Sequence, residues 1–200
     1  PMVKYWMHNG LMRASSSTGK VGGQADRAAN ASAGDDVSGK ISRSKGGGGL
    51  AKLIEEQTGE RLRFFLLRSH YRSTTVFGDE PLAEAGVALE AFYRLFDRYE
   101  KICGASVYEL PINTKRADFV APSSTHAIVK EVVALREGFL TKMDDDFNTG
   151  GAVSDLFEMA RCLNRLIDAE KLEEPGSNEA GKIALQQAMA ILRETAAILG

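Results

Sequence analysis

The stretch DEPLAEAGVALEAFYRLFDRYEKI, residues 79–102, decides the fold of this chain. Its large apolar residues recur three or four positions apart, which places them on one face of an α-helix. Asp79 is a good N-cap, and Pro81 suits the first turn. We therefore expect a long amphipathic helix that needs other helices to bury its apolar face. The apolar positions are Leu82, Ala85, Leu89, Phe92, Tyr93 and Phe96.

Three segments downstream show the same helical spacing. Ser124 and Thr149 are the expected N-caps of the first two, and a polar loop at residues 170–178 precedes the third. The apolar positions are Ile128, Val132, Leu135 and Phe139, then Leu156, Phe157, Ala160, Leu163 and Ile167, and finally Ile183, Leu185, Ala188, Ile191, Leu192 and Ile198. Shorter helices are expected at residues 50–56 and 60–68, and an aperiodic connector at 103–122. So many amphipathic helices predict a helical bundle.

Composition sets bounds on the function. The 200 residues allow one or two domains with a hydrophobic core. A net charge of −2 gives no global positive field, so RNA contact would have to come from a local basic patch. The candidates for such a patch are Arg161 and Arg165 on one helix face, and Arg94, Arg98 and Lys101 on another, although solvated helix faces have the same pattern.

Cysteine usage and hydropathy indicate a cytoplasmic protein. Cys103 and Cys162 have no spacing typical of a metal site or a disulfide framework, which fits a reducing compartment. Cys162 falls on an apolar helical face, where a buried thiol is expected. No apolar run approaches the ~20 residues that span a bilayer, so we expect no membrane contact.

The N-terminal region differs from the rest of the chain. Residues 3–7 are rich in strand formers, and a single strand needs neighbours, so we expect this one to belong to a sheet whose other strands are missing. Sixteen of the 26 residues from Ala14 to Gly39 are Gly, Ala or Ser. Such a segment buries too little surface to offset its ordering entropy, and we expect a mobile loop.

A basic, glycine-rich stretch follows that loop. Lys40-Ile41-Ser42-Arg43-Ser44 alternates cations with hydroxyls and continues into Lys45 and four glycines at residues 46–49. Backbone N–H groups and side-chain donors in such a loop can surround an anion such as a triphosphate.

Lys40 to Ser44 resembles the Lys-Met-Ser-Lys-Ser signature of class I aminoacyl-tRNA synthetases, with Ile for Met and Arg for the second Lys. Three other segments share this resemblance: residues 5–12 before the signature, and residues 62–73 and 143–149 after it. In this order and spacing, the four segments make the chain similar to the C-terminal half of bacterial-type cysteinyl-tRNA synthetase. The resemblance covers the whole chain except an insertion at about residues 13–39. The resemblance implies a mainly α fold: a helical-bundle tRNA-binding domain preceded by the terminal strand and signature loop of a Rossmann-like class I catalytic domain.

This resemblance also implies a domain organisation. Residues 1–49 would end the catalytic domain and carry the insertion and the signature loop. Residues 50–78 would form a helical junction, and residues 79–200 a bundle of the tRNA- or anticodon-binding type.

The resemblance implies the site residues as well. Lys40, Ser42 and Arg43 would be catalytic, because the signature loop closes over ATP and steadies the departing pyrophosphate. The whole signature, with Ile41 and Ser44, would bind ATP. His8 would help to line that site, although a structural histidine at a strand end is an equal alternative. Arg43 carries a planar guanidinium in place of the family's ammonium and can still clamp phosphate oxygens.

Other polar residues have structural interpretations. His70 and Arg72 either brace the domain junction, which we favour, or contact the tRNA acceptor end. The carboxylates at residues 144–146 precede a helix and favour its positive end, which suits a structural role better than a metal site. Gly150 and Gly151 stand where the family has a proline and should soften the helix start. We expect no metal ligand in this chain, because the family's zinc-binding positions and its His-Ile-Gly-His motif lie upstream.

The function implied by the resemblance is that of the C-terminal part of a monomeric cysteine–tRNA ligase, with cysteine, ATP and tRNA-Cys as partners. Without the first ATP motif and the zinc site, the chain alone should not catalyse. One alternative is a stand-alone, non-catalytic tRNA-binding module. Another is the related cysteine ligase of mycothiol synthesis, although the Asp-Asp-Asp-Phe-Asn-Thr segment and the trailing bundle favour the synthetase.

Overall fold

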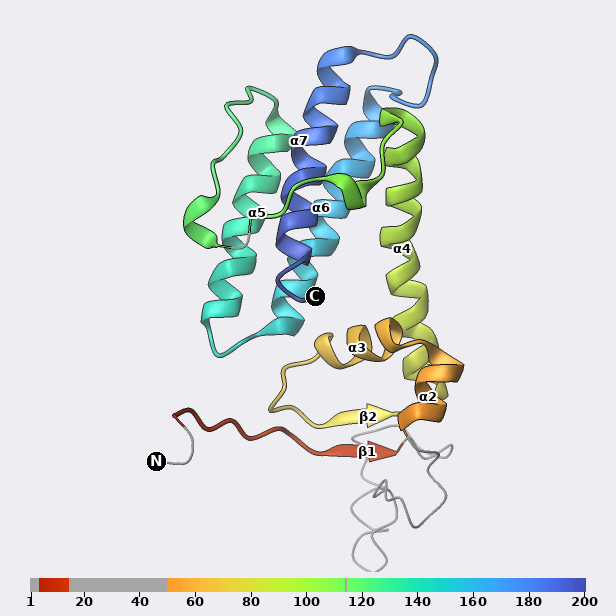
Figure 1. Cartoon of the computed structure of the whole chain (residues 1–200), viewed down its shortest axis with the longest axis vertical. Helices are drawn as coiled ribbons and strands as arrows, with labels where there is room; N and C mark the ends of the chain where they lie inside the picture. Colours follow the sequence, from red (N-terminus) through yellow and green to blue (C-terminus); the bar gives the residue numbers. More distant parts are fainter. Residues whose placement is uncertain (1–3, 15–49, 114) are drawn as a thin grey trace, which may run out of the picture. The chain divides into compact units, whose positions relative to one another are not determined.

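The computed structural model describes residues 4–14, 50–113 and 115–200 (Figure 1). The chain forms two compact units. Of the described residues, the first unit holds those up to Leu66 together with Tyr71–Gly86, and the second holds those of Leu67–His70 and Val87–Gly200. The chain therefore enters the second unit for four residues, returns to the first, and leaves it again within a long helix.

The first unit contains a small parallel sheet. Strand β1, Met12–Ala14, pairs with β2, Thr75–Phe77, so that Met12 lies opposite Thr75. Helix α2, Leu50–Gln57, and helix α3, Gly59–Leu67, confirm the two short helices expected here. The left-handed backbone of Thr58, with φ 65°, separates them. Phe65 of α3 is buried and meets the ring of Phe77 edge-on, with 6.0 Å between the ring centroids.

The strand expected at residues 3–7 is wrong for the residues that the structure describes, since 4–11 contain no strand. Tyr5 and Trp6 are 78% and 75% exposed. Strand preference is mainly a preference for a packed, half-buried surface, and these side chains lack one. The strand begins at Met12 instead, after Thr75 N–H donates to the Leu11 carbonyl at 2.9 Å.

The second unit is a helical bundle, as expected. Its helices are α4, Asp79–Cys103, whose first part lies in the first unit, α5, Ala127–Asp144, α6, Thr149–Ala169, and α7, Glu179–Ala196. Helices α5, α6 and α7 pack against one another (Figure 1), and α4 meets α6 through the rings of Phe92 and Phe157. The fully buried side chains include Leu95, Tyr99, Val132, Phe139, Met159, Leu163, Leu166, Leu185, Met189 and Leu192.

The connector between α4 and α5 contains two short 3-10 helices, η2 at Val107–Glu109 and η3 at Arg116–Asp118. No longer helix or strand occurs in its described residues, in agreement with the aperiodic sequence. Cys162 of α6 is a buried, free thiol as expected, and burial raises its pKa to about 11.

The helix caps differ from the sequence prediction by one or two residues. Asn148, not Thr149, caps α6, because its side-chain oxygen accepts the Gly151 N–H at 3.0 Å. His126 caps α5 by accepting the Ile128 N–H at its Nδ1, while the Ser124 hydroxyl accepts the N–H of His126 itself. Adjacent cap-forming residues compete, and tertiary contacts decide between them.

Candidate functional site

The predicted ATP-binding signature, Lys40, Ile41, Ser42, Arg43 and Ser44, lies outside the described residues. Of the predicted site residues the structure describes His8 alone. Its side chain is exposed, and its ring lies 6.4 Å from that of Trp6 between centroids, nearly parallel to it.

Close backbone packing fixes the chain just after His8. The Gly10 N–H donates to the Tyr71 carbonyl at 2.7 Å. A Cβ at Gly10 would lie 2.1 Å from the carbonyl oxygen of Ser73, so only glycine fits this approach. The segment that carries His8 is thereby tied to residues 71–73, within the first unit.

Residues 67–70 are held by the turn between α5 and α6, within the second unit. The Thr149 hydroxyl donates to the Ser69 carbonyl at 3.2 Å. His70 Nε2 lies 3.7 Å from a carboxylate oxygen of Asp146. The contacts of His70 lie within the second unit and do not test the role at the domain junction expected for it, whereas the Arg72 Nε donates to the hydroxyl of its neighbour Tyr71.

The three aspartates at residues 144–146 have separate structural contacts, two through the carboxylate and one, at Asp145, through the backbone N–H. Asp144 accepts a hydrogen bond from Arg116 at 2.6 Å, the Asp145 N–H ends α5 by donating to the Thr141 carbonyl, and Asp146 faces His70. Across the part of the chain that the structure describes, no group of three or more His, Cys, Asp or Glu side chains is placed to hold a metal ion.

Gly150 allows the close approach of α6 to residues 67–70, because a Cβ there would lie 2.9 Å from the Arg68 carbonyl oxygen. We expect Gly150→Ala to lower the free energy of unfolding by about 1–3 kcal/mol, as overpacking does, despite the better helix propensity of alanine. Hydrogen exchange at residues 67–70 should accelerate more than exchange in α7. Gly59→Ala is the matched control, since no described atom lies within 4 Å of its Cβ position. Unchanged exchange at 67–70 in Gly150→Ala would contradict this packing role.

The arginines considered for RNA contact are paired with acids. Arg98 of α4 donates from Nε and Nη2 to both carboxylate oxygens of Glu173 at 3.0 Å and from Nη2 to Asp168 at 2.6 Å, and these bonds, chiefly those to Glu173, raise its pKa. The other pairs are Arg94 with Glu90, Arg161 with Glu158, and Arg165 with Glu131. The second unit is acidic, with 14 Lys and Arg against 18 Asp and Glu.

A buried ion pair in the bundle was missed by sequence reasoning. Arg136 is 3% exposed and donates to Glu194 at 3.1 Å and to Glu137 at 2.8 Å. Its guanidinium carbon lies 3.6 Å from the ring centroid of Phe119. The sequence does contain a signal for the burial of Arg136, because this residue falls on the same helical stripe as the apolar Val132 and Phe139.

Comparison with known proteins gives two kinds of match. Residues 138–200 match the DALR domain family. A cysteine–tRNA ligase of Trichlorobacter lovleyi is 30% identical over 199 residues, covering 99% of this chain and 34% of the relative. Cysteine–tRNA ligases of Geobacter metallireducens and Halalkalibacterium halodurans are 31% and 28% identical, each over 201 residues that cover 100% of this chain and 34% of the relative.

The chain thus spans about a third of the length of these curated relatives. Among the described helices, none combines the length and the apolar character needed to cross a membrane.

Proposed function

The chain belongs to the cysteine–tRNA ligase family, and on that premise we propose that it forms the C-terminal, tRNA-binding part of a ligase that joins cysteine to tRNA-Cys. The observation that carries this proposal is that the residues matched by the DALR family form helices of the bundle in the structure. The DALR match covers residues 138–200, which form the end of α5 and all of α6 and α7, and the rest of the chain aligns with the same relatives.

The signature loop gives this chain a second proposed role, in ATP-dependent activation of cysteine. Lys40, Ser42 and Arg43 would steady the phosphates of ATP as the amino acid attacks, and Ile41 and Ser44 would complete the loop. The proposal rests on the spelling of the loop and its place before the junction. His8 would lie at the edge of that site. We further propose that the protein acts as a monomer in the cytoplasm.

The zinc ion implied by the family resemblance does not fit the described residues, which offer no suitable cluster of donors. The proposed organisation remains a catalytic-domain end at 1–49, a helical junction at 50–78, and a tRNA-binding bundle at 79–200.

Direct binding tests the proposal. We expect the full 200-residue chain to bind fluorescently labelled tRNA-Cys more tightly than a tRNA for another amino acid, measured by anisotropy. Affinity for both should fall as salt rises from about 50 to 200 mM, because phosphate contacts release counterions. Absence of binding at the lower salt concentration would refute the tRNA-binding role.

A further inference from the structure

Three cations on one side of the second unit differ from the paired arginines, as do Lys115 in the connector and Lys130 of α5. Lys101 at the end of α4, and Lys182 and Arg193 on α7, form no ion pair within the described residues. In an acidic bundle where most arginines face carboxylates, unpaired cations that gather on one side provide a local site for an anionic partner.

These cations share one side of the bundle. Lys182, Gln186 and Arg193 lie along one stripe of α7, because steps of four and eleven residues return to nearly the same face. Lys182 and Arg193 are about 16 Å apart along the helix axis. Gln186 hydrogen-bonds the thiol of Cys103, the last residue of α4, and the positive charge of Lys182 acts on the same thiol. The stripe therefore lies next to the end of α4 that carries Lys101.

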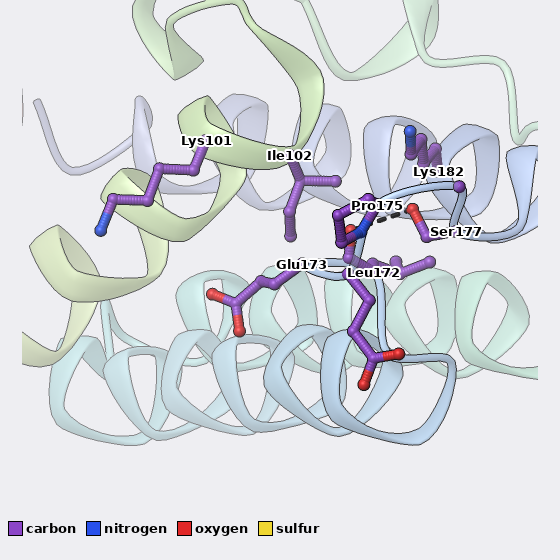
Figure 2. Close-up of a pocket in the computed structure, with 9 residues that line it drawn as sticks. Lys101, Ile102, Leu172, Glu173, Pro175, Ser177 and Lys182 are labelled. Carbon is purple, nitrogen blue, oxygen red and sulfur yellow. Dashed lines mark hydrogen bonds between the residues drawn. The ribbon is translucent and has the colours of Figure 1, made fainter.

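A cavity of about 320 Å³ lies between the two lysines. Figure 2 shows Lys101 and Lys182 on opposite sides of it, with Ile102, Glu173, Leu172 and Pro175 between them. The cavity is lined by both polar and apolar side chains and has a lysine at each side, so that the phosphates of one nucleic-acid strand could meet a cation on either side of it.

Carboxylates also line this cavity, but each has a cation of its own. Glu173 accepts two hydrogen bonds from Arg98 at 3.0 Å, and Glu174 lies 3.6 Å from Lys171. The ammonium groups of Lys101 and Lys182 form no ion pair with a carboxylate among the described residues, although the hydrogen bonds from Arg98 and, to a lesser extent, the positive charge of Lys101 lower the pKa of Glu173.

Arg193 extends the positive surface toward the connector. Its guanidinium carbon lies 5.6 Å from the ring centroid of Tyr108, which is 64% exposed. The Nε of Arg193 is buried and has no hydrogen-bond partner among the described residues. An exposed aromatic ring beside a guanidinium can stack on an unpaired base, as single-stranded RNA requires.

We propose that Lys101, Tyr108, Lys182 and Arg193 form the RNA-contacting face of the helical unit, which we call the basic face. The lysines bind phosphates on either side of the cavity, and Tyr108 with Arg193 stacks on a base. This inference rests on the proposed tRNA-binding function and specifies which surface performs it. The partner class is RNA, because the face combines separated cations with an aromatic ring.

The test is a charge-neutralising double variant, Lys101→Gln with Lys182→Gln, in the full chain. Labelled tRNA-Cys is titrated at several salt concentrations. We expect an affinity loss of at least about tenfold at low salt, and a salt slope smaller by roughly 1.5, since each lost phosphate contact removes about 0.7–0.9. The matched control is Lys115→Gln with Lys130→Gln, which removes two exposed lysines that also lack an ion pair in the described structure. The control should keep the wild-type slope within error.

The outcomes separate the two proposals. If the wild-type chain does not bind tRNA, both the proposed function and the basic face are refuted. If it binds and the two double variants behave alike, only the basic face is refuted. A second pair tests stacking: Tyr108→Ala should weaken binding and Tyr108→Phe should retain it, and equal binding by the two would exclude a stacking role. Thermal unfolding of each variant shows that the fold is retained.

Discussion

Replacing Arg136 by alanine is expected to lower the free energy of unfolding by about 3–5 kcal/mol, because it breaks a buried ion pair and leaves one partner uncompensated. Glu194, whose side chain is 9% exposed, would lose its guanidinium partner and keep only the hydrogen bond from Asn113 Nδ2 at 2.7 Å. The Phe119 ring would also lose the guanidinium stacked on it. Since Asn113 and Phe119 belong to the connector, the contacts between the connector and the bundle should weaken as well.

Chemical denaturation followed by helical circular dichroism measures this loss. The exposed pair between Arg161 and Glu158 provides the control, and Arg161→Ala should cost no more than about 1 kcal/mol. A second variant separates the charge from the packing. Arg136→Met combined with Glu194→Leu replaces both charges by apolar groups and should restore much of the stability. Equal losses of unfolding free energy in Arg136→Ala and Arg161→Ala would show that the buried pair stabilises the fold no more than an exposed pair does.

The sequence was sufficient to predict the helical bundle because apolar residues that recur every three or four positions fit one face of an α-helix and do not fit a strand. Leu82, Ala85 and Phe92 recur along α4 at spacings that a helix places on one face, and all three are buried; Val132 and Phe139 do the same in α5. Most of the helix boundaries also follow from the sequence, since polar loops such as residues 170–178 separate the apolar stripes. A local sequence pattern is therefore sufficient to predict burial wherever burial depends on one face of a single helix.

Features that depend on contacts distant in sequence were not predictable in this way. The role of Gly150 depends on the Arg68 carbonyl, more than eighty positions away, so this glycine makes a packing contact that its place at a helix start did not reveal. Strand β2 is three residues long and is defined by its pairing with β1. The paired state of Arg98 depends on Glu173, which no helical pattern connects to it. These cases show tertiary contacts overriding local preference.

Arg43 of the signature loop is expected to contribute strongly to the activation of cysteine. We expect Arg43→Ala to lower kcat/KM for cysteine-dependent ATP–pyrophosphate exchange by about 100-fold, measured after this chain is joined to the complete catalytic domain of a cysteine–tRNA ligase. Loss of a donor that stabilises transition-state charge costs about 3 kcal/mol, and each 1.36 kcal/mol is a factor of ten in rate. The reaction develops negative charge on the departing pyrophosphate, which a guanidinium fork can bind through two parallel hydrogen bonds.

The conservative variant distinguishes charge from geometry. Arg43→Lys places the family's own residue at this position and should retain activity within about tenfold, whereas Arg43→Gln keeps donors without the charge and should resemble alanine. Binding of tRNA-Cys should be the same in all three variants, because the basic face lies in the helical unit and not in the loop. A loss of tRNA binding together with activity would instead assign Arg43 to the RNA, and full activity in Arg43→Ala would remove it from the ATP site.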